Sequence, residues 1–222
     1  MNSPVLERTV QPEILDTLPE DDPGAIRNRQ DILRINRIMG TFSWFHRQLR
    51  AHLRPGEPIL EIGAGAGDLA CFLHHRSGPE HLNWTGLDTW SRPAAWPDDW
   101  DWVVQDLTTF SGYPDYPVIV GNLILHQFKN PDLRDLGKRL SRKARLLLFN
   151  EPARHPFPLF LMRASFLIGM HPISRHDGSI SVRAGFRGEE LPRLLELPPD
   201  SWSWKLQTTL AGGYRMAAWR KA

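Results

Sequence analysis

The chain has 222 residues, of which 41% are hydrophobic and 23% are charged. This length fits one domain with at most a small appendage, and the apolar share is enough to build a buried core. The formal net charge is only +2 and the basic residues are scattered, so no nucleic-acid partner is expected. No run of about 20 apolar residues occurs, so we expect no membrane span.

Cysteine usage and the first residues favour a cytoplasmic protein. The single cysteine, Cys71, excludes a disulfide within the chain and suits a reducing compartment. Its place in an expected helix favours a small core residue over a nucleophile. The N-terminus is polar and acidic, so no signal peptide is expected. No residues fall at metal-ligand spacing, so no metal site is predicted.

Two regions precede the first expected strand. Residues 1–21 contain three prolines and several acids, which is typical of an extended arm or a partly ordered tail. Asp22 and Pro23 then predict a helix start, as N-cap and first-turn residue. Apolar residues recur at helical spacing beyond this point, and Gly40 is expected to divide residues 22–56 into two helices.

Residues 58–69, PILEIGAGAGDL, form the most informative stretch. A short apolar run closed by a glycine loop is typical of the first parallel strand of an α/β sheet. Gly63, Gly65 and Gly67 remove side chains where the backbone must turn sharply or admit a ligand. The helix expected from Asp68 would point its free amides at whatever lies over the loop.

The glycine spacing and one acid indicate which ligand this loop holds. The dinucleotide pattern is G-x-G-x-x-G, whereas the spacing here is G-x-G-x-G. Glu61 lies two positions before the first glycine, where a carboxylate would repel a pyrophosphate but suit a cation. S-adenosylmethionine (SAM) carries a sulfonium and an α-ammonium group. A glycine-rich turn without any ligand is the alternative.

Residues 61–67, EIGAGAG, match in full the first motif of the class I SAM-dependent methyltransferases, E/D-x-G-x-G-x-G, and the chain resembles that family. The resemblance implies SAM as the cofactor and an α/β fold. That fold is a Rossmann-like, seven-stranded, mostly parallel sheet with helices on both faces, an N-terminal helical cap and a C-terminal antiparallel hairpin. The expected cofactor-binding residues of the motif are Glu61, Gly63, Ala64, Gly65 and Gly67.

Two further strands end in acidic residues. Asp88 closes the second expected strand about 20 residues beyond the glycine loop, where a carboxylate can accept both ribose hydroxyls. Asp88 and Thr89 are therefore expected at the cofactor, with a loop-capping aspartate as the alternative. Asp106 closes the third strand. The resemblance implies that Asp106 accepts from the adenine amino group and that Leu107 offers its backbone amide; a surface turn is the alternative.

The fourth expected strand, residues 118–122, leads into a candidate base. Asn122 and His126 are four positions apart, so one helical turn would place both on one side. In the resembling family this strand end faces the transferred methyl group and often reads N/S-x-x-L-H, which NLILH fits. Asn122 and Leu123 are therefore expected at the cofactor. His126 is the first candidate general base, with a packing role as the alternative.

Strand and helix alternate up to a fifth expected strand, residues 145–149, so the sheet should be parallel. The apolar run that follows is too short for a membrane span and contains Arg163. We expect a helix there, where this fold builds substrate lids; such a lid favours a hydrophobic or aromatic substrate, and a core helix is the alternative. The expected organisation is an N-terminal arm (1–21), a helical cap (22–56) and a methyltransferase domain (57–222) with a lid at about 154–178.

The end of the chain predicts a hairpin and a narrower resemblance. Residues 202–210 and 214–219 are expected strands joined by a glycine turn, and in this fold the seventh strand inserts between the fifth and sixth. Arg29 to Arg37 and Asp177 to Leu191 are similar to segments of small bacterial methyltransferases found beside type III polyketide synthases. That likeness implies O- or C-methylation of a phenolic or lipid-like acceptor. Asn36 and Arg37 are expected on a solvated helix face, with contact to a ligand as the alternative.

Methyl transfer from SAM is an in-line displacement, so the protein mainly aligns the partners and excludes water, which is worth about 7–11 kcal/mol. A hydroxyl acceptor would also need a base, typically worth about 10²–10⁴-fold. His126, His155 and His176 are the candidates, because histidine titrates near neutrality.

Three functions compete on this sequence. The favoured one is methyl transfer to a small-molecule acceptor, hydrophobic or phenolic. The second is an RNA or protein methyltransferase, although the N/D-P-P-Y/F signature of amino-methylating enzymes is absent at residues 122–125. The third is a non-catalytic cofactor-binding module of the same fold.

Overall fold

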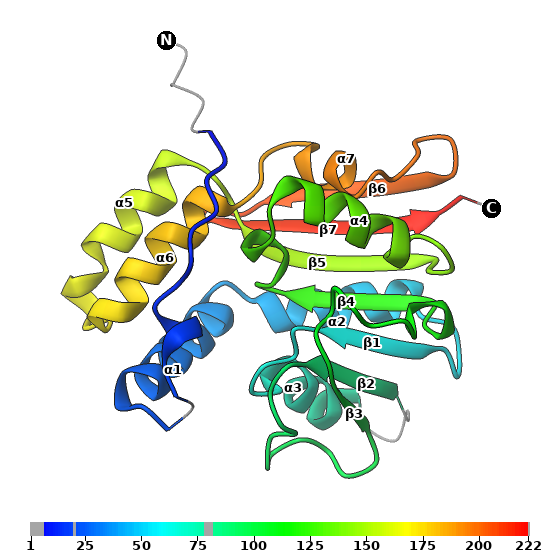
Figure 1. The fold of residues 1–222 in the computed structure, drawn as a ribbon, viewed down its shortest axis with the longest axis horizontal. Helices are drawn as coiled ribbons and strands as arrows, with labels where there is room; N and C mark the ends of the chain where they lie inside the picture. The colour runs from blue at the N-terminus through cyan, green and yellow to red at the C-terminus, as the bar shows by residue number, and fades with distance from the viewer. Residues whose placement is uncertain (1–6, 20, 78–81, 222) are drawn as a thin grey trace.

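The computed structural model describes residues 7–19, 21–77 and 82–221, and within these residues seven strands form one sheet (Figure 1). The strand order is β3-β2-β1-β4-β5-β7-β6. The first five strands run parallel, while β7 runs antiparallel to both β5 and β6. The strands are β1 (Pro58–Ile62), β2 (Asn83–Asp88), β3 (Asp101–Val104), β4 (Val118–Asn122), β5 (Leu146–Pro152), β6 (Trp202–Thr208) and β7 (Gly213–Arg220). The predicted sheet is thus confirmed, including the position of the last strand.

Helices cover both faces of the sheet, and a third group lies beyond the carboxyl ends of its parallel strands (Figure 1). The helices are α1 (Pro23–Ile38), α2 (Thr41–His52), α3 (Asp68–Ser77), α4 (Asn130–Leu140), α5 (Pro156–Ala164), α6 (Pro172–Ala184) and α7 (Glu190–Leu194). The 3-10 segments are η1 (Leu15–Thr17), η2 (Tyr113–Asp115), η3 (Leu125–Gln127) and η4 (Ser165–Ile168). The third group is α1, α5 and α6.

Alternate side chains of the strands serve two separate cores, as the two-residue period of a strand requires. Leu60 and Ile62 of β1 pack with Leu133 of α4 on one face. Ile59 of β1 belongs to the core on the other face, where it packs with Leu73 of α3. The second core also contains the stacked indoles of Trp84 and Trp100. Because both faces are filled, the carboxyl edge of the sheet is where a ligand site can form.

The predicted start and division of the N-terminal helices are confirmed. Asp22 caps α1, since its Oδ1 accepts hydrogen bonds from the amides of Gly24 (2.7 Å) and Ala25 (3.1 Å). Pro23 is the first helical residue, where its missing N–H costs nothing. Gly40 separates α1 from α2 in the left-handed conformation, at φ +61°.

Several boundaries differ from the expectation. The helix α6 continues past residue 178, the expected end of the lid, and is held by packing against α1 and α5. Gly178 within it lowers helix propensity, so the sequence alone did not indicate a helix there. β3 ends at Val104, two residues before Asp106. The helix that the sequence predicts from Asp68 is expected to end near residues 78–79, which lie outside the described residues.

Gly137 provides a test of how closely α4 packs on the segment after α7. A Cβ at this position would overlap the backbone of Leu195, which cannot move as a side chain can. An alanine in a helix normally gains about 1 kcal/mol over glycine. We nevertheless expect Gly137→Ala to lower the free energy of unfolding by about 1–3 kcal/mol in chemical denaturation, because overpacking outweighs propensity.

The matched control is Gly178→Ala in α6, whose Cβ would meet the flexible side chain of Met162. This variant should lose less stability than Gly137→Ala. Equal or greater stability of Gly137→Ala relative to the wild type would contradict the packing described.

Candidate functional site

A cavity of about 270 Å³ lies at the carboxyl edge of the sheet, beneath α1, α5 and α6. Its lining comes from four sources: the glycine loop after β1, the ends of β4 and β5, the cap helices, and the N-terminal segment. Lining residues from the first two sources include Glu61, Gly63, Ala64, Gly65, Asn122, Leu123, His126, Asn150 and Glu151. Six of these lining residues are ones that the sequence predicts to bind the cofactor: Glu61, Gly63, Ala64, Gly65, Asn122 and Leu123.

The glycine loop presents an open backbone to this cavity. Gly63, Gly65 and Gly67 all have positive φ, at +63°, +54° and +76°. A Cβ at Gly63 would collide with Ile124, whereas no atom lies within 4 Å of a Cβ built on Gly65. The loop therefore needs glycine for its conformation, and at Gly65 it leaves free space that a ligand can occupy.

Asp88 fixes the shape of the same loop. Its Oδ2 accepts the amide of Gly65 at 2.8 Å, and its Oδ1 accepts the amide of Trp90 at 3.0 Å. Asp88 and Thr89 do not line the cavity but lie at its border, at the end of β2. The carboxylate is therefore held beside the open turn, where it can also accept hydroxyl groups of a ligand.

Glu61 differs from the sequence expectation in its charge. Its side chain is only 2% exposed, and its Oε2 accepts a hydrogen bond from the Trp84 indole at 3.0 Å. Burial raises the pKa of Glu61 to about 8, with Asp68 and Asp88 adding to the rise and the Trp84 bond opposing it. At neutral pH the carboxyl of Glu61, near the end of β1, is therefore protonated. A nearby cation would favour its ionisation.

The residues predicted at the adenine end lie farther out. Asp106 follows β3 and is exposed; its Oδ1 accepts from the amide and the hydroxyl of Thr108, at 2.7 and 2.6 Å. The next residue, Leu107, is buried. Gly67 begins the turn into α3, against the Trp96 indole. Neither Asp106, Leu107 nor Gly67 lines the cavity.

The end of β4 forms the cavity floor together with the end of β5. Asn122 accepts a hydrogen bond from the side-chain amide of Asn150 at 2.9 Å. The amide of Leu123 donates to the Asn150 carbonyl at 2.8 Å, and Leu123 adopts φ +60°, which is uncommon for a residue with a side chain. Backbone strain of this kind is concentrated at functional sites in proteins.

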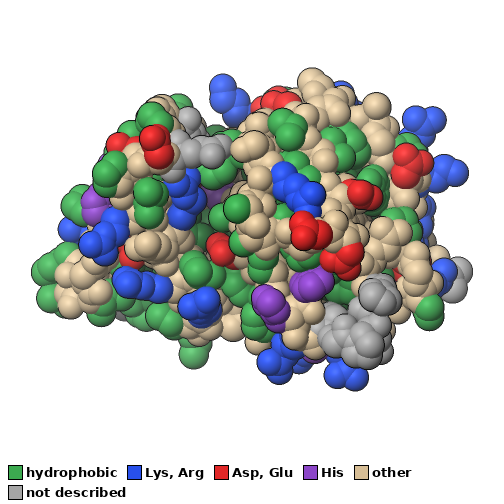
Figure 2. Space-filling view, turned by 90° about the horizontal axis from the view of Figure 1, so that it is seen from below, with side chains coloured by type: hydrophobic (Ala, Val, Ile, Leu, Met, Phe, Trp, Pro, Cys, Tyr) green, Lys and Arg blue, Asp and Glu red, His purple; other side chains and the backbone are tan. Residues whose placement is uncertain are grey.

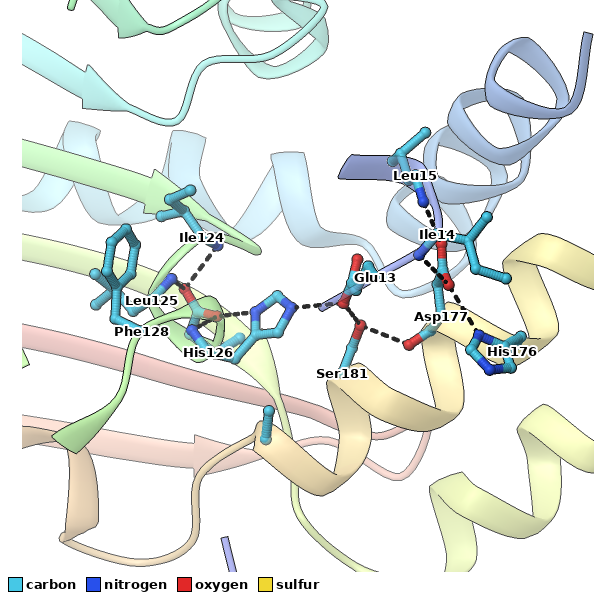
Figure 3. Close-up of polar contacts among 12 residues, drawn as sticks. Glu13, Ile14, Leu15, Ile124, Leu125, His126, Phe128, His176, Asp177 and Ser181 are labelled. Atoms are coloured by element: carbon cyan, nitrogen blue, oxygen red, sulfur yellow. Dashed lines mark hydrogen bonds and ion pairs between the residues drawn. The ribbon is translucent and has the colours of Figure 1, made fainter. Parts of the chain in front are cut away.

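His126 lies between two carboxylates (Figure 3). Its Nδ1 is 2.7 Å from Oε2 of Glu151, and its Nε2 is 3.4 Å from Oε1 of Glu13. Burial alone would lower the pKa of His126, but the hydrogen bonds to Glu13 and Glu151 and their negative charges raise it to about 9. The ring that lines the cavity is therefore an imidazolium at neutral pH.

The N-terminal segment 7–19, called the arm below, is part of the site. Glu13 accepts the Ser181 hydroxyl of α6 as well as the His126 ring. The amides of Ile14 and Leu15 donate to the buried carboxylate of Asp177, at 2.9 and 3.0 Å (Figure 3). The sequence predicted an extended arm or a partly ordered tail, but it did not indicate that this arm contacts the site.

Arg8 fastens the beginning of the arm to the protein. Its guanidinium donates to the carbonyls of Ala184 (2.7 Å), Phe128 (2.8 Å) and His126 (3.1 Å), and it lies over the Phe186 ring. The arm is thus attached both to the turn after β4 and to α6.

Of the three candidate bases, only His126 lines the cavity. His155 caps α5, where its Nδ1 accepts the amide of Phe157 at 3.2 Å, and it is exposed. His176 is also exposed and lies 3.1 Å from Oδ1 of Asp177, on the outer side of α6. The structure therefore does not bring His155 or His176 into the cavity.

Sequence reasoning missed several lining residues, and their common feature is a polar side chain on the cap. Asn36 is buried and lines the cavity, so the expected solvated face is wrong at this position. Asn28 donates to Asp177 at 3.3 Å. The sequence feature that could have pointed to these cap residues is the similarity of segments 29–37 and 177–191 to one group of methyltransferases. Glu13 had no such signal.

Two further kinds of site are missing from the described ranges. Residues 7–19, 21–77 and 82–221 contain no group of three or more His, Cys, Asp or Glu side chains placed to hold a metal ion. Within the same ranges, no helix has the length and apolarity that crossing a membrane requires.

These features define a class I SAM-dependent methyltransferase fold, and solved structures agree. The plantazolicin methyltransferase BpumL in complex with SAH has a TM-score of 0.72 and 12% identity, covering 94% of this chain and 93% of that chain. BamL, with a triazolic desmethylPZN analog and SAH, has a TM-score of 0.66 and 13% identity, covering 93% and 92%. The methyltransferase domain of bacterial CtHen1 has a TM-score of 0.59 and 13% identity, covering 86% and 100%.

No protein-family model and no curated protein matches the sequence. At 12–13% identity the structural likeness establishes the fold.

Glu61 allows a test of the buried carboxyl. Its pKa of about 8 in the folded protein exceeds the ordinary value of 4.5, so ionisation increasingly opposes folding as the pH rises from about 4.5 to 8. Glu61→Gln removes that penalty and keeps an acceptor for Trp84. We expect its melting temperature to exceed that of the wild type by at least about 4 °C at pH 8.5, with a smaller gain at pH 5.5.

The control for this test is Asp200→Asn, at an exposed carboxyl, which should leave the melting temperature unchanged at both pH values. A melting temperature of Glu61→Gln below that of the wild type at pH 8.5 would show that ionisation of the buried Glu61 carboxyl does not destabilise the folded protein.

Proposed function

We propose that the protein is a SAM-dependent methyltransferase that acts on a small hydrophobic or phenolic acceptor, by O- or C-methylation. The single observation that carries this proposal is the side-chain-free turn at Gly65, bordered by Glu61 and Asp88 and open to the cavity. A pyrophosphate would meet the Asp88 carboxylate there and would keep Glu61 protonated, whereas a sulfonium or an ammonium group would be attracted by Asp88 and would favour ionisation of Glu61. The single Cys71 supports a cytoplasmic location.

The residues of the site fit SAM. Glu61, Gly63, Ala64, Gly65, Asn122 and Leu123 would hold its methionine part, because they line the cavity. Asp88 and Thr89 would hold the ribose, and by family resemblance Asp106 and Leu107 would hold the adenine. When bound, SAM supplies an activated methyl group on its sulfonium.

The acceptor is proposed to occupy the part of the cavity under the cap. Ile32 and Ile35 of α1, Met39 directly after α1, and Met162 of α5 provide an apolar wall. Glu13 adds a carboxylate that can accept a hydrogen bond from a hydroxyl group. An apolar wall with a few polar groups suits a phenol or a similar ring compound.

The organisation of the chain follows from this arrangement. We propose that residues 57–222 form the methyltransferase domain, that 22–56 cap it, and that the insertion from about residue 154 acts as the substrate lid. From the expected N-terminal region 1–21, the described arm 7–19 contributes Glu13 and is anchored through Arg8, Ile14 and Leu15. Together they shield the acceptor from water, which strengthens every electrostatic interaction in the cavity.

His126 is proposed as the base for a hydroxyl acceptor. The ring lines the cavity and Glu151 holds its Nδ1, so Nε2 is the nitrogen that would take the proton, with the acceptor hydroxyl replacing its 3.4 Å contact with Glu13. Because its pKa is raised to about 9, most molecules carry a protonated ring at pH 7. The neutral fraction that can take a proton from the acceptor therefore grows as the pH approaches 9.

A second candidate is a peptide-derived acceptor. It is favoured by the likeness to BpumL, whose complex with a monoazolic desmethylPZN analog and SAH has a TM-score of 0.70 and 13% identity with this chain. Incubation with labelled SAM and a panel of phenols, polyketides and short peptides would separate the two classes. Labelling confined to peptides would overturn the proposal of a phenolic acceptor.

Gly65→Arg tests the cofactor site. The added side chain would fill the space that the turn leaves open, so we expect calorimetric titration to detect no SAM binding while the circular dichroism spectrum stays close to that of the wild type. Gly56→Arg is the matched control, because Gly56 also has a positive φ (+75°) and free space around its Cβ but does not line the cavity. Wild-type affinity in Gly65→Arg would refute the site.

The role of His126 predicts a pH dependence. With a hydroxyl acceptor, turnover should rise with pH and level off above about 9. His126→Gln should lower turnover by about 10²–10⁴-fold and remove this rise, with little change in SAM affinity. An unchanged rate or pH profile in the variant would exclude His126 as the base.

The stability of the protein should fall as the pH rises, whereas turnover should rise. Stability must therefore be measured as a control. The pKa of His126 is higher in the folded protein than its ordinary 6.5, so its ion pairs contribute fully below about pH 6.5 and are lost as the pH rises through about 9. Rates should therefore be compared only at pH values at which melting curves show a folded protein.

A further inference from the structure

The helix α5 and the segment η4 expose an unusual amount of apolar surface. Of the residues of α5, only Pro158 is buried, although the helix is mostly apolar. Leu167 and Ile168 of η4 are each 74% exposed. The exposed large apolar side chains of this region, called the apolar tip below, are Phe157, Phe160, Phe166, Leu167 and Ile168. A core helix, one alternative from the sequence, would not show this pattern.

The surroundings of the apolar tip are basic. Residues 155–176 contain two arginines, Arg163 and Arg175, and three histidines but no aspartate or glutamate. Arg175 lies over the Phe166 ring. Arg27 and Arg34 of α1 lie beside the turn from η4 to α6, in a shallow hollow.

The acid that lines this hollow, Asp31, is buried. Asp31 shares the hollow but is turned inward, where its carboxylate accepts from the His171 amide and the Ser174 hydroxyl, at 2.9 and 2.8 Å. It also lies 3.5 Å from Arg34. At the end of the molecule that carries α1 and α5, Figure 2 shows Lys and Arg side chains among hydrophobic ones, with Asp or Glu side chains at the edge of this region.

We propose that the apolar tip docks onto an anionic lipid surface. Leu167 and Ile168 would enter the boundary between headgroups and acyl chains, and the arginines around them would lie against lipid phosphates. Exposed aliphatic and aromatic side chains with a basic rim are the features of a segment that binds in the plane of a bilayer interface. The occupant is inferred from this charge complementarity.

Other occupants fit the tip less well. Single-stranded RNA is bound through stacking on aromatic rings, yet the two most exposed side chains, Leu167 and Ile168, have no ring. A second copy of the chain would bring the same arginines together across a two-fold axis, where like charges repel.

The position of the tip links docking to the cavity. Met162 of α5 and Met170, two residues beyond η4, line the cavity on the inner side of the same elements. Docking would therefore place one wall of the cavity at the bilayer, from which an apolar acceptor could enter. This consequence rests on the proposed methyl transfer, whereas docking itself does not.

Vesicle co-sedimentation of the full chain, without SAM, tests docking. The wild type should bind vesicles of phosphatidylcholine with 30 mol% phosphatidylglycerol, and more weakly those of phosphatidylcholine alone or those tested at high salt. Leu167→Ser/Ile168→Ser should weaken binding at least about tenfold. Val104→Ser/Leu210→Ser is the matched control, since it removes two exposed apolar side chains elsewhere, and it should bind within about twofold of the wild type.

Several results would overturn the proposal. These are no binding to anionic vesicles, equal binding to neutral ones, or equal losses in the two double variants. Light scattering that shows a dimer lost only in Leu167→Ser/Ile168→Ser would assign the tip to a second copy, and tip-dependent binding of single-stranded RNA in place of vesicles would assign it to nucleic acid. Because SAM is absent, a failed docking test leaves the methyltransferase proposal standing, and calorimetry with SAM tests that separately.

Discussion

The Glu151 carboxylate is the interaction on which the site depends. It is completely buried at the end of β5 and accepts the amides of Ile124, Leu125 and His126 as well as the His126 ring. A buried amide left without a partner costs about 1–3 kcal/mol, so this one side chain compensates for a whole turn of backbone. By fixing the turn after β4, it sets the cavity floor and presents the outer nitrogen of His126 to Glu13. The His126 ring thereby joins the end of the sheet to the arm, in addition to the bonds of Arg8.

Buried carboxylates also fasten the rest of the cap. Asp31 of α1 binds the start of α6, and Asp177 of α6 binds the arm and Asn28. Such bonds are directional, so they fix the helices in one register where apolar contacts would tolerate sliding. None of these bonds involves α5, which packs against α6 and exposes Phe157 and Phe160.

The sheet could be predicted from the sequence because its signals are local. Short apolar runs, glycine loops and the acids at strand ends are read from neighbouring residues, and Gly63, Gly65 and Asp88 are indeed brought together. The cap could not be predicted in the same way. Glu13 and His126 are far apart in the chain, and nothing local indicates that they meet. The charge of Glu61 also escaped prediction, because a pKa depends on burial that only the folded structure defines.

The central claim is that the open turn at Gly65 holds a cationic methyl donor. The most direct measurement is a crystal structure of the protein soaked with S-adenosylhomocysteine (SAH), the demethylated product of SAM, and in parallel with a nicotinamide dinucleotide. The account predicts SAH along the turn, with the ribose hydroxyls on Asp88, and no dinucleotide at the same place. Density for the dinucleotide over Gly65, with SAH absent, would contradict it.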